Sequence, residues 1–213
     1  MNILKPKETE LKNIVRLEKT LTEIEEDDTI VEKLIENQEI SEAEINSIKF
    51  ENVIFNNVNL TNRKIEKSTF TNVRFKDCNF SNTVFENSNF TRCEFNNCKI
   101  TGCNYIESKL YNVSFNDTNN SYISFSMSGL ENTIFNNTNL RNSYFQDDDL
   151  KKVFFEKADL TQAQFFGTSL KDIDLSNSNI EGIAVTLKDV KGAIINEFQA
   201  IELLYLIGVK IKQ

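Results

Sequence analysis

Large apolar side chains recur every five residues over most of this chain. From residue 40 to residue 190, every position that is a multiple of five is apolar except Asn120, although apolar residues make up only 39% of the sequence. Of the 17 phenylalanines, 14 fall in this register. A period of five fits neither an α-helix nor a β-strand, whose side-chain periods are 3.6 and 2. A fixed repeat of this kind predicts a solenoid.

A second pattern precedes the first by two residues. These positions carry small residues, as at Cys78, Ser88 and Cys98. We therefore expect the chain to turn a corner every five residues, with one large and one small side chain pointing inward. Four such sides close a coil of about 20 residues, and coils stack at the strand spacing of about 4.8 Å. About 150 residues then give roughly 7.5 coils and a rod on the order of 36 Å long.

The repeat resembles that of the pentapeptide-repeat family, in which a small residue, Asn or Asp, and Leu or Phe are followed by two variable residues. The matching stretches are residues 78–80, 88–90, 138–140, 158–160 and 178–180. The resemblance covers about 150 of the 213 residues. It implies an all-β solenoid, a right-handed quadrilateral β-helix.

The flanks lose the five-residue register, so we expect three parts. These are an N-terminal helical cap over residues 1–39, the β-helix over residues 40–195, and a C-terminal helix and strand over residues 196–213. In the N-terminal part, apolar residues at helical spacing predict helices between residues 8 and 37 that cover the open core. They are Leu11, Ile14, Val15, Leu21, Ile30, Val31, Leu34 and Ile35.

The C-terminal part predicts one helix and a dimer. Asn196 and Gln199 form a capping-box pattern, and the helix is expected to run to about Ile207 and stop at Gly208. Residues 209–212 alternate like an edge strand. The helix is apolar nearly all round, so one face can plug the last coil while the other is left to bury against a second copy; the alternative is a simple end cap. The residues expected at this interface are Phe198, Ile201, Leu204 and Tyr205.

Composition favours a cytoplasmic protein without catalytic or metal chemistry. The net charge is −8, and the sequence holds no His, a single Pro and no nucleotide-binding glycine motif. No apolar run is long enough to span a membrane, and the N-terminus lacks the pattern of a signal peptide. The four cysteines all occupy inward slots at five-residue multiples, which favours buried free thiols over a disulfide or a metal site. We expect no enzymatic activity and no cofactor.

The C-terminal half narrows the resemblance. Residues 158–182 and the helix before Gly208 resemble the closing coils and tail of the quinolone-resistance (Qnr) proteins. The register has no insertion from 40 to 190, as in the loopless Gram-positive members and the MfpA-like proteins of mycobacteria. The resemblance implies a dimeric rod shaped like B-form DNA that binds the type II topoisomerases DNA gyrase or topoisomerase IV, opposes fluoroquinolones, and does not itself bind nucleic acid.

Charge gives this function limited support. A DNA duplex about 36 Å long, the length of the predicted rod, carries roughly 21 negative charges, at one per about 1.7 Å. The net charge of this chain is only −8. Residues 101–150 form the one acidic stretch of the rod, with six acidic residues opposed only by Lys109 and Arg141. We expect a basic groove on a partner to bind this acidic belt. Its members are Glu107, Asp117, Glu131, Asp147, Asp148 and Asp149. The alternative is a non-enzymatic interaction scaffold for an unrelated protein partner.

Three residues break the repeat. Asn120 places an amide in an axial slot, where it needs a hydrogen-bonding partner. Arg63 and Asp148 occupy inward small-residue slots. We expect the chain to bulge there and turn both side chains outward; the alternative is a local change in the shape of the rod that suits a partner.

Overall fold

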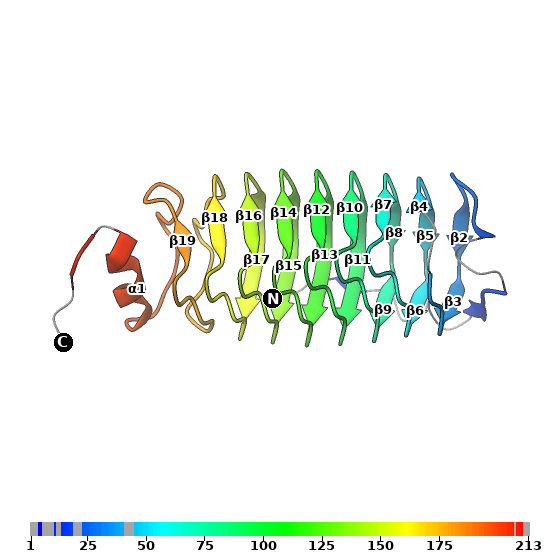
Figure 1. Ribbon diagram of the computed structural model, residues 1–213, viewed down its shortest axis with the longest axis horizontal. Coiled ribbons are helices and arrows are strands. Elements are labelled where there is room, and N and C mark those ends of the chain that lie inside the picture. Colours follow the sequence, from blue (N-terminus) through cyan, green and yellow to red (C-terminus); the bar gives the residue numbers. More distant parts are fainter. Residues whose placement is uncertain are drawn as a thin grey trace.

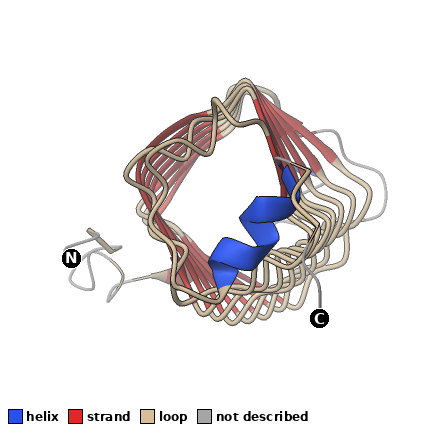
Figure 2. Ribbon diagram, turned by 90° about the vertical axis from the view of Figure 1, so that its left-hand side faces the viewer, coloured by secondary structure: helices blue, strands red, loops and turns tan. Residues whose placement is uncertain are grey.

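The chain forms a four-sided parallel solenoid of roughly eight coils, closed at its C-terminal end by one helix (Figures 1 and 2). The computed structural model describes residues 4–5, 11, 14–18, 23–40, 45–206 and 208–210. Strand partners are separated by one coil of the expected length, as in the pairs Phe85↔Tyr105 and Phe125↔Phe145. The predicted all-β solenoid is therefore confirmed, and so is the length of its coil.

Three of the four sides are regular parallel β-sheet. An eleven-stranded sheet covers two adjacent sides, and an eight-stranded sheet covers the third. The first comprises β1 (Val15–Arg16), β2 (Thr29–Val31), β3 (Lys33–Glu36), β5 (Lys49–Glu51), β6 (Ile54–Asn56), β8 (Thr69–Thr71), β9 (Arg74–Lys76), β11 (Asn89–Asn96), β13 (Lys109–Asn116), β15 (Gly129–Asn136) and β17 (Asp149–Glu156). The second comprises β4 (Ile45–Asn46), β7 (Lys64–Glu66), β10 (Val84–Glu86), β12 (Asn104–Ile106), β14 (Ser124–Ser126), β16 (Tyr144–Gln146), β18 (Gln164–Phe166) and β19 (Ala184–Val185).

The fourth side is held by single bridges, which join one residue of each coil to the next from Glu39↔Asn59 to Asp159↔Asn179. We call it the bridge side.

Stacked aromatic rings fill the axis of the solenoid. Most rings lie on the ring at the same position of the next coil, with centroids 4.7 Å apart for Phe70–Phe90 and 4.5 Å for Phe75–Phe95. Rings on neighbouring sides of one coil meet edge-on, as Phe75 and Phe80 do at 5.3 Å. Both arrangements are favourable for aromatic pairs. The five-residue register therefore buries one continuous core along the whole rod.

The small inward residues act as hydrogen-bond donors as well as spacers. The hydroxyl of Thr83 donates to the Leu60 carbonyl at 2.6 Å, and the thiol of Cys103 donates to the Phe80 carbonyl at 2.7 Å. Each acceptor belongs to the preceding coil. Ser, Thr and Cys therefore suit this slot because they satisfy backbone carbonyls that turn inward at the corners. All four cysteines are buried and free, as expected from the sequence.

The corners are made by residues with positive φ. All the non-glycine residues of this kind carry numbers that end in 2 or 7, and most are Asn or Asp. These side chains tolerate the left-handed region better than other non-glycine residues do. Several also bond from coil to coil, as Asn57 Nδ2 donates to Asn37 Oδ1 at 2.8 Å. The excess of asparagine in the sequence thus follows from the corner geometry.

The predicted N-terminal helices are wrong where the structure describes this region. Residues 29–36 form β2 and β3, which pair in parallel with β5 and β6. Ile30 and Ile35 fill the same axial slots as Phe50 and Phe55, so the five-residue register begins before residue 40. Upstream, β1 pairs with β3. Leu21 and most of residues 8–22 lie outside the described residues.

The predicted C-terminal helix is confirmed as α1 (Gln199–Leu206), which lies across the end of the solenoid (Figure 2). The Asn196 N–H donates to Gln199 Oε1 at 2.9 Å, and the Gln199 N–H donates to Asn196 Oδ1 at 3.0 Å. This is the reciprocal capping box that the sequence indicates. Val209 and Lys210 are not in a strand, and the rest of the predicted edge strand lies outside the described residues.

Within the part of the chain that the structure describes, no helix is both long and apolar enough to cross a membrane.

Candidate protein-interaction surfaces

The functional surface of this molecule is its outside, because side chains fill its axis. The hollows on the described surface are shallow grooves. One of about 360 Å³ lies beside Gly129, where a missing side chain leaves a notch between Lys109 and Asp149. In the described ranges, no group of three or more His, Cys, Asp or Glu side chains is placed to hold a metal ion. The sides of the rod are therefore considered one at a time.

The six residues of the predicted acidic belt do not form one belt. Glu107 and Asp147 occupy the same corner row of the eight-stranded side, with Met127 between them, as expected from their spacing in whole coils. Asp117 lies at a corner beside the bridge side, where it accepts a hydrogen bond from Asn137 Nδ2 at 2.6 Å. The charges are thus spread around the rod.

The remaining exposed acids lie on the eleven-stranded sheet. Glu131 in β15 and Asp149 in β17 line the groove beside Gly129, together with Lys109 and Lys151. Lys151 Nζ lies 2.5 Å from Asp149 Oδ2. The acidic character of this groove is therefore offset by lysines.

Asp148 is not a surface residue, so its assignment to the belt is wrong. Its side chain points inward and is 6% exposed, and the strand ladder passes it without a bulge. Oδ1 accepts a hydrogen bond from the Ser128 N–H at 2.8 Å, whereas Oδ2 has no partner within the described residues. Burial raises the pKa of Asp148 to about 7, although the bond from Ser128 favours the carboxylate.

The other two breaks in the repeat also leave the ladder intact. Arg63 is partly exposed, its Nε donates to the Thr61 carbonyl at 3.1 Å, and its own carbonyl accepts from the Val84 N–H at 2.8 Å. Asn120 is fully buried, and neither amide atom has a partner among the residues described. The sequence predicts a hydrogen-bonding partner for the Asn120 amide, but no described residue provides one.

One part of the eleven-stranded sheet is contacted by the N-terminal segment. The Leu4 N–H donates to Asn112 Oδ1 at 3.4 Å, and Lys5 Nζ lies 3.7 Å from Glu94 Oε1. Glu94 also pairs with Arg74 at 3.0 Å. Asn112 and Glu94 are buried, whereas Lys152, two coils beyond Asn112 in the same corner row, is exposed. The chain itself therefore covers part of this sheet.

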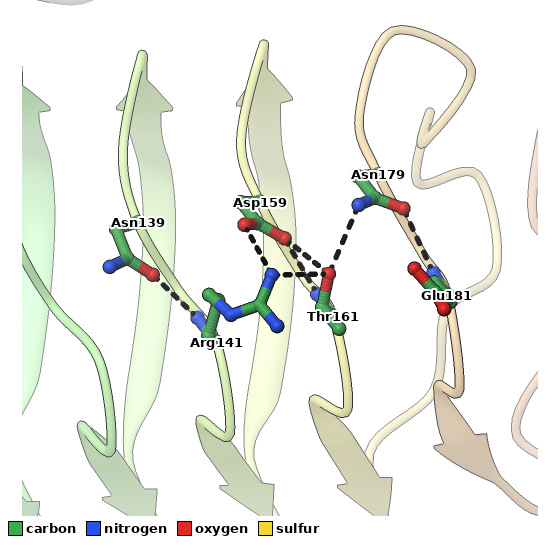
Figure 3. Close-up of polar contacts among 6 residues, drawn as sticks. All are labelled: Asn139, Arg141, Asp159, Thr161, Asn179 and Glu181. Carbon is green, nitrogen blue, oxygen red and sulfur yellow. Dashed lines mark hydrogen bonds and ion pairs between the residues drawn. The ribbon is translucent and has the colours of Figure 1, made fainter.

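On the bridge side, polar side chains satisfy one another across three coils (Figure 3). Arg141 Nη1 lies 3.0 Å from Asp159 Oδ2 and donates to Thr161 Oγ1 at 3.2 Å. Asn179 Nδ2 donates to the same hydroxyl at 3.0 Å. Burial disfavours the Asp159 carboxylate, but the bonds from Thr161 and Arg141 outweigh it and hold the pKa of Asp159 below its usual value. Arg141 is thus neutralised locally.

The eight-stranded side carries a group of exposed apolar side chains that the sequence analysis missed. The group, which we call the aromatic patch, comprises Tyr122, Met127, Tyr144 and Phe166, with exposed fractions of 56%, 57%, 40% and 46%. Tyr122 and Met127 lie at the two corners that flank β14, Tyr144 lies in β16 and Phe166 lies in β18; these are consecutive strands of the sheet. Tyr144 and Phe166 point to solvent because they lie one residue before or after an axial slot, whereas Tyr122 and Met127 stand at the corners with positive φ.

The four residues predicted at the dimer interface are all exposed on or beside α1, and Phe198 is exposed by 76%. On the opposite face, Leu203 and Leu206 pack against the core of the last coils. Gln199 is buried and donates through Nε2 to the carbonyls of Leu175 and Ser178 at 2.8 and 2.7 Å. One face of the helix therefore closes the core and the other remains uncovered.

Comparisons with known sequences concern the repeat. A family profile described as a pentapeptide repeat region matches residues 88–165, and one described as pentapeptide repeats (8 copies) matches residues 43–82, 68–104 and 149–182. Together they span residues 43–182. No curated protein matches the sequence.

Several solved structures align with this chain at low sequence identity. Full-length QnrB1, described as a plasmid-mediated fluoroquinolone resistance protein, is 17% identical over 83% of this chain and 97% of its own, with a TM-score of 0.31. A trypsin-treated variant of QnrB1 is 17% identical over 84% and 97%, with a TM-score of 0.34. HetL from the cyanobacterium Nostoc sp. strain PCC 7120, described as involved in heterocyst differentiation regulation, is 12% identical over 81% and 91%, with a TM-score of 0.31.

Proposed function

Because the chain belongs to the pentapeptide-repeat family, we propose that it is a non-enzymatic rod that occupies the DNA-binding groove of DNA gyrase or topoisomerase IV and so protects the enzyme from fluoroquinolones. The observation that carries the proposal is the uninterrupted solenoid, whose ladder runs from β2 to β19 without an inserted loop. Such a rod offers a partner a long, rigid side, and the grooves on its described surface are open to solvent.

The dimensions of the rod suit this role. Roughly eight coils at about 4.8 Å give a length of about 38 Å. One turn of B-form DNA is about 34–36 Å long. A single copy of the chain thus matches about one turn of duplex.

We propose further that two copies join end to end through the uncovered face of α1. Phe198, Ile201, Leu204 and Tyr205 are exposed there, and an apolar face that remains open to water favours self-association. A twofold interface between identical faces closes after two copies, so it produces a dimer and no filament. The dimer presents a rod about two turns of duplex long.

This chain carries much less negative charge than a DNA duplex of the same length. A duplex of about 38 Å carries about 22 negative charges, whereas the whole chain has a net charge of −8. Recognition by a basic groove then rests on shape and on a few acids such as Glu107 and Asp147. This shortfall is the observation that favours the second candidate, an interaction scaffold for an unrelated protein.

The decisive test is a supercoiling assay with purified DNA gyrase, with and without ciprofloxacin, titrated with the full chain. We expect supercoiling to recover in the presence of the drug as the chain is added. Inhibition in both arms indicates occupation of the groove without protection. No effect in either arm, repeated with topoisomerase IV and its decatenation assay, favours the scaffold.

A further inference from the structure

We infer that the eight-stranded side of the rod is the side that the partner binds, through the aromatic patch and the acids beside it. This inference rests on the proposed function, since it names the surface by which the chain contacts a topoisomerase. The partner that we infer is a protein with a basic groove that also offers apolar contacts.

The patch is compact and regular. Tyr144 in β16 pairs with Ser124 in β14, and Phe166 in β18 pairs with Gln146 in β16. Tyr122, Tyr144 and Phe166 therefore advance by one coil and two residues at each step. At the usual strand spacing and rise, successive members of this diagonal lie about 8 Å apart. Met127 lies at the corner next to it, so the four side chains form one surface on consecutive coils.

The chemistry of the patch points to a protein partner. Tyrosine, phenylalanine and methionine are enriched in the centres of protein interfaces, where aromatic side chains contribute most of the binding energy. Neighbouring outward positions in the same strands are small or polar, as at Ser124, Ser126 and Gln146. Isolated apolar residues on a surface need no explanation, but four within three adjacent coils form a coherent patch.

Charge beside the patch selects a basic partner. Glu107 and Asp147 flank Met127 along its corner row, both are exposed, and neither has an ion-pair partner within the described part of the chain. Arg141, the cation closest to Tyr144 in the sequence, is held by Asp159 on the bridge side. The local field is therefore negative, which repels nucleic acid and attracts a groove lined with Lys and Arg.

The other sides are less suited to docking. Leu4 and Lys5 contact Asn112 and Glu94 on the eleven-stranded sheet, so the chain partly covers that surface. On the bridge side, polar groups already satisfy one another. Among the described surfaces along the rod, the eight-stranded side carries three exposed aromatic residues beside unpaired acids, whereas the eleven-stranded sheet offers Tyr111 next to Glu131 in a groove that Lys109 and Lys151 also line.

The test compares two outward tyrosines of the full chain. Tyr144 lies in the patch, and Tyr111, which is 43% exposed, lies in β13 on the eleven-stranded sheet. Binding of each variant to purified DNA gyrase and topoisomerase IV is measured by biolayer interferometry at low and high salt. We expect Tyr144→Ala and Phe166→Ala each to raise Kd at least about tenfold, and Tyr111→Ala to change it less than about twofold.

A second pair of variants tests the charge. Glu107→Gln is expected to weaken binding and to reduce its salt dependence, whereas Asp117→Asn, at a different corner of the rod, leaves both unchanged. Thermal unfolding of all five single variants should match that of the wild type, because each side chain is exposed.

The outcomes separate the inference from the function on which it rests. If the wild type binds neither enzyme, the proposed function fails and the inference falls with it. If the wild type binds and Tyr144→Ala binds equally well, the proposed function stands and the inference is overturned. If Tyr144→Ala alters sedimentation of the free chain instead, the patch joins two copies of this chain and the inference is again overturned.

Discussion

Single residues in the inward slots determine how well the core is satisfied. Asn120 stands in an axial slot between Ile100 and Leu140 of the adjacent coils, and all three are fully buried. Its amide atoms lack partners among the described residues, and an unsatisfied buried amide destabilises the folded state.

We therefore expect Asn120→Leu to raise the free energy of unfolding by about 1–3 kcal/mol, since it removes an unpaired amide and restores the apolar stack. Urea denaturation followed by circular dichroism measures the change. Leu140→Asn is the matched control, because it places an amide in the same column of axial residues and should lower the free energy of unfolding. A loss of stability in Asn120→Leu contradicts this account and indicates that the amide is well bonded in solution.

Asp148 makes stability depend on pH. It interrupts a column in which each backbone N–H donates to the hydroxyl of the next coil, as the Ser88 N–H does to Ser108 Oγ at 3.1 Å. A carboxylate in this slot accepts from Ser128 but cannot donate to a carbonyl as the serines do. Its pKa is about 7 in the folded chain and near the ordinary 3.8 when unfolded. The folded state thus binds the proton more tightly.

This carboxyl group therefore favours folding most at low pH, and its contribution is lost as the pH rises from about 4 through about 7. We expect Asp148→Ser to gain stability relative to the wild type as the pH rises, so the difference in the free energy of unfolding should be larger at pH 8 than at pH 5. At pH 8 the variant should be more stable by roughly 2–4 kcal/mol. Urea titrations at both pH values test this, with Asp117→Asn, an exposed acid at a different corner of the rod, as control. An equal difference at both pH values contradicts it.

At the scale of single elements, α1 has two faces with different roles. Leu203 and Leu206 close the core, so substitutions there unfold the last coil. Phe198 and Tyr205 are exposed, so we expect substitutions there to leave the fold intact and to act on the proposed association of two copies.

We expect the wild type to sediment as a dimer at micromolar concentration and the double variant Phe198→Glu, Tyr205→Glu to sediment as a monomer, because charges replace the apolar face. Glu197→Gln, beside the same face, is the control and should remain a dimer. Analytical ultracentrifugation measures all three. A monomeric wild type refutes the dimer.

The sequence predicts some elements well and others poorly, for physical reasons. The axial register and the Asn196–Gln199 capping box were readable because each depends on fixed spacing between neighbouring residues. The N-terminal strands were missed because Ile30 and Leu34 fit a helical spacing, while Ile30 and Ile35 fit the five-residue spacing of the solenoid. Their partner strands lie a whole coil away in the sequence, so only the pairing resolves the choice.

The candidate site was harder to predict. Asp148 was placed on the surface because charged residues are rarely buried, yet one hydrogen bond and a raised pKa suffice to keep it inside. The acidic belt was predicted from acidic residues that lie close together in the sequence. Residues that are neighbours in a corner row are instead separated by a whole coil of sequence. The aromatic patch follows a diagonal across the coils, which becomes visible only when the coils are stacked.

At the scale of the whole molecule, stability is a sum over neighbouring coils. From β2 to β19, neighbouring coils pair with each other and strand partners keep the same offset of one coil, whereas β1 pairs with β3 at a shorter offset. The length of the rod can therefore change only in steps that preserve this offset.

Deletion of residues 69–88 should leave a shorter but cooperative rod, because it removes one whole coil and rejoins the chain in register. Deletion of residues 69–75 breaks the five-residue register and moves polar side chains into the axial slots of the joined coil, so cooperative unfolding should be lost. Thermal unfolding followed by circular dichroism compares the two. Equal damage from both deletions contradicts a fold built of interchangeable coils.

The ring column also provides the protein with its own optical probe. Tyr105 is the tyrosine of the axial stack, between Phe85 and Phe125 with centroids 4.8 and 5.1 Å away, and the sequence has no Trp. Light absorbed by phenylalanines along the column should pass from ring to ring and emerge as tyrosine emission. Its loss on unfolding reports the continuity of the column without an added dye.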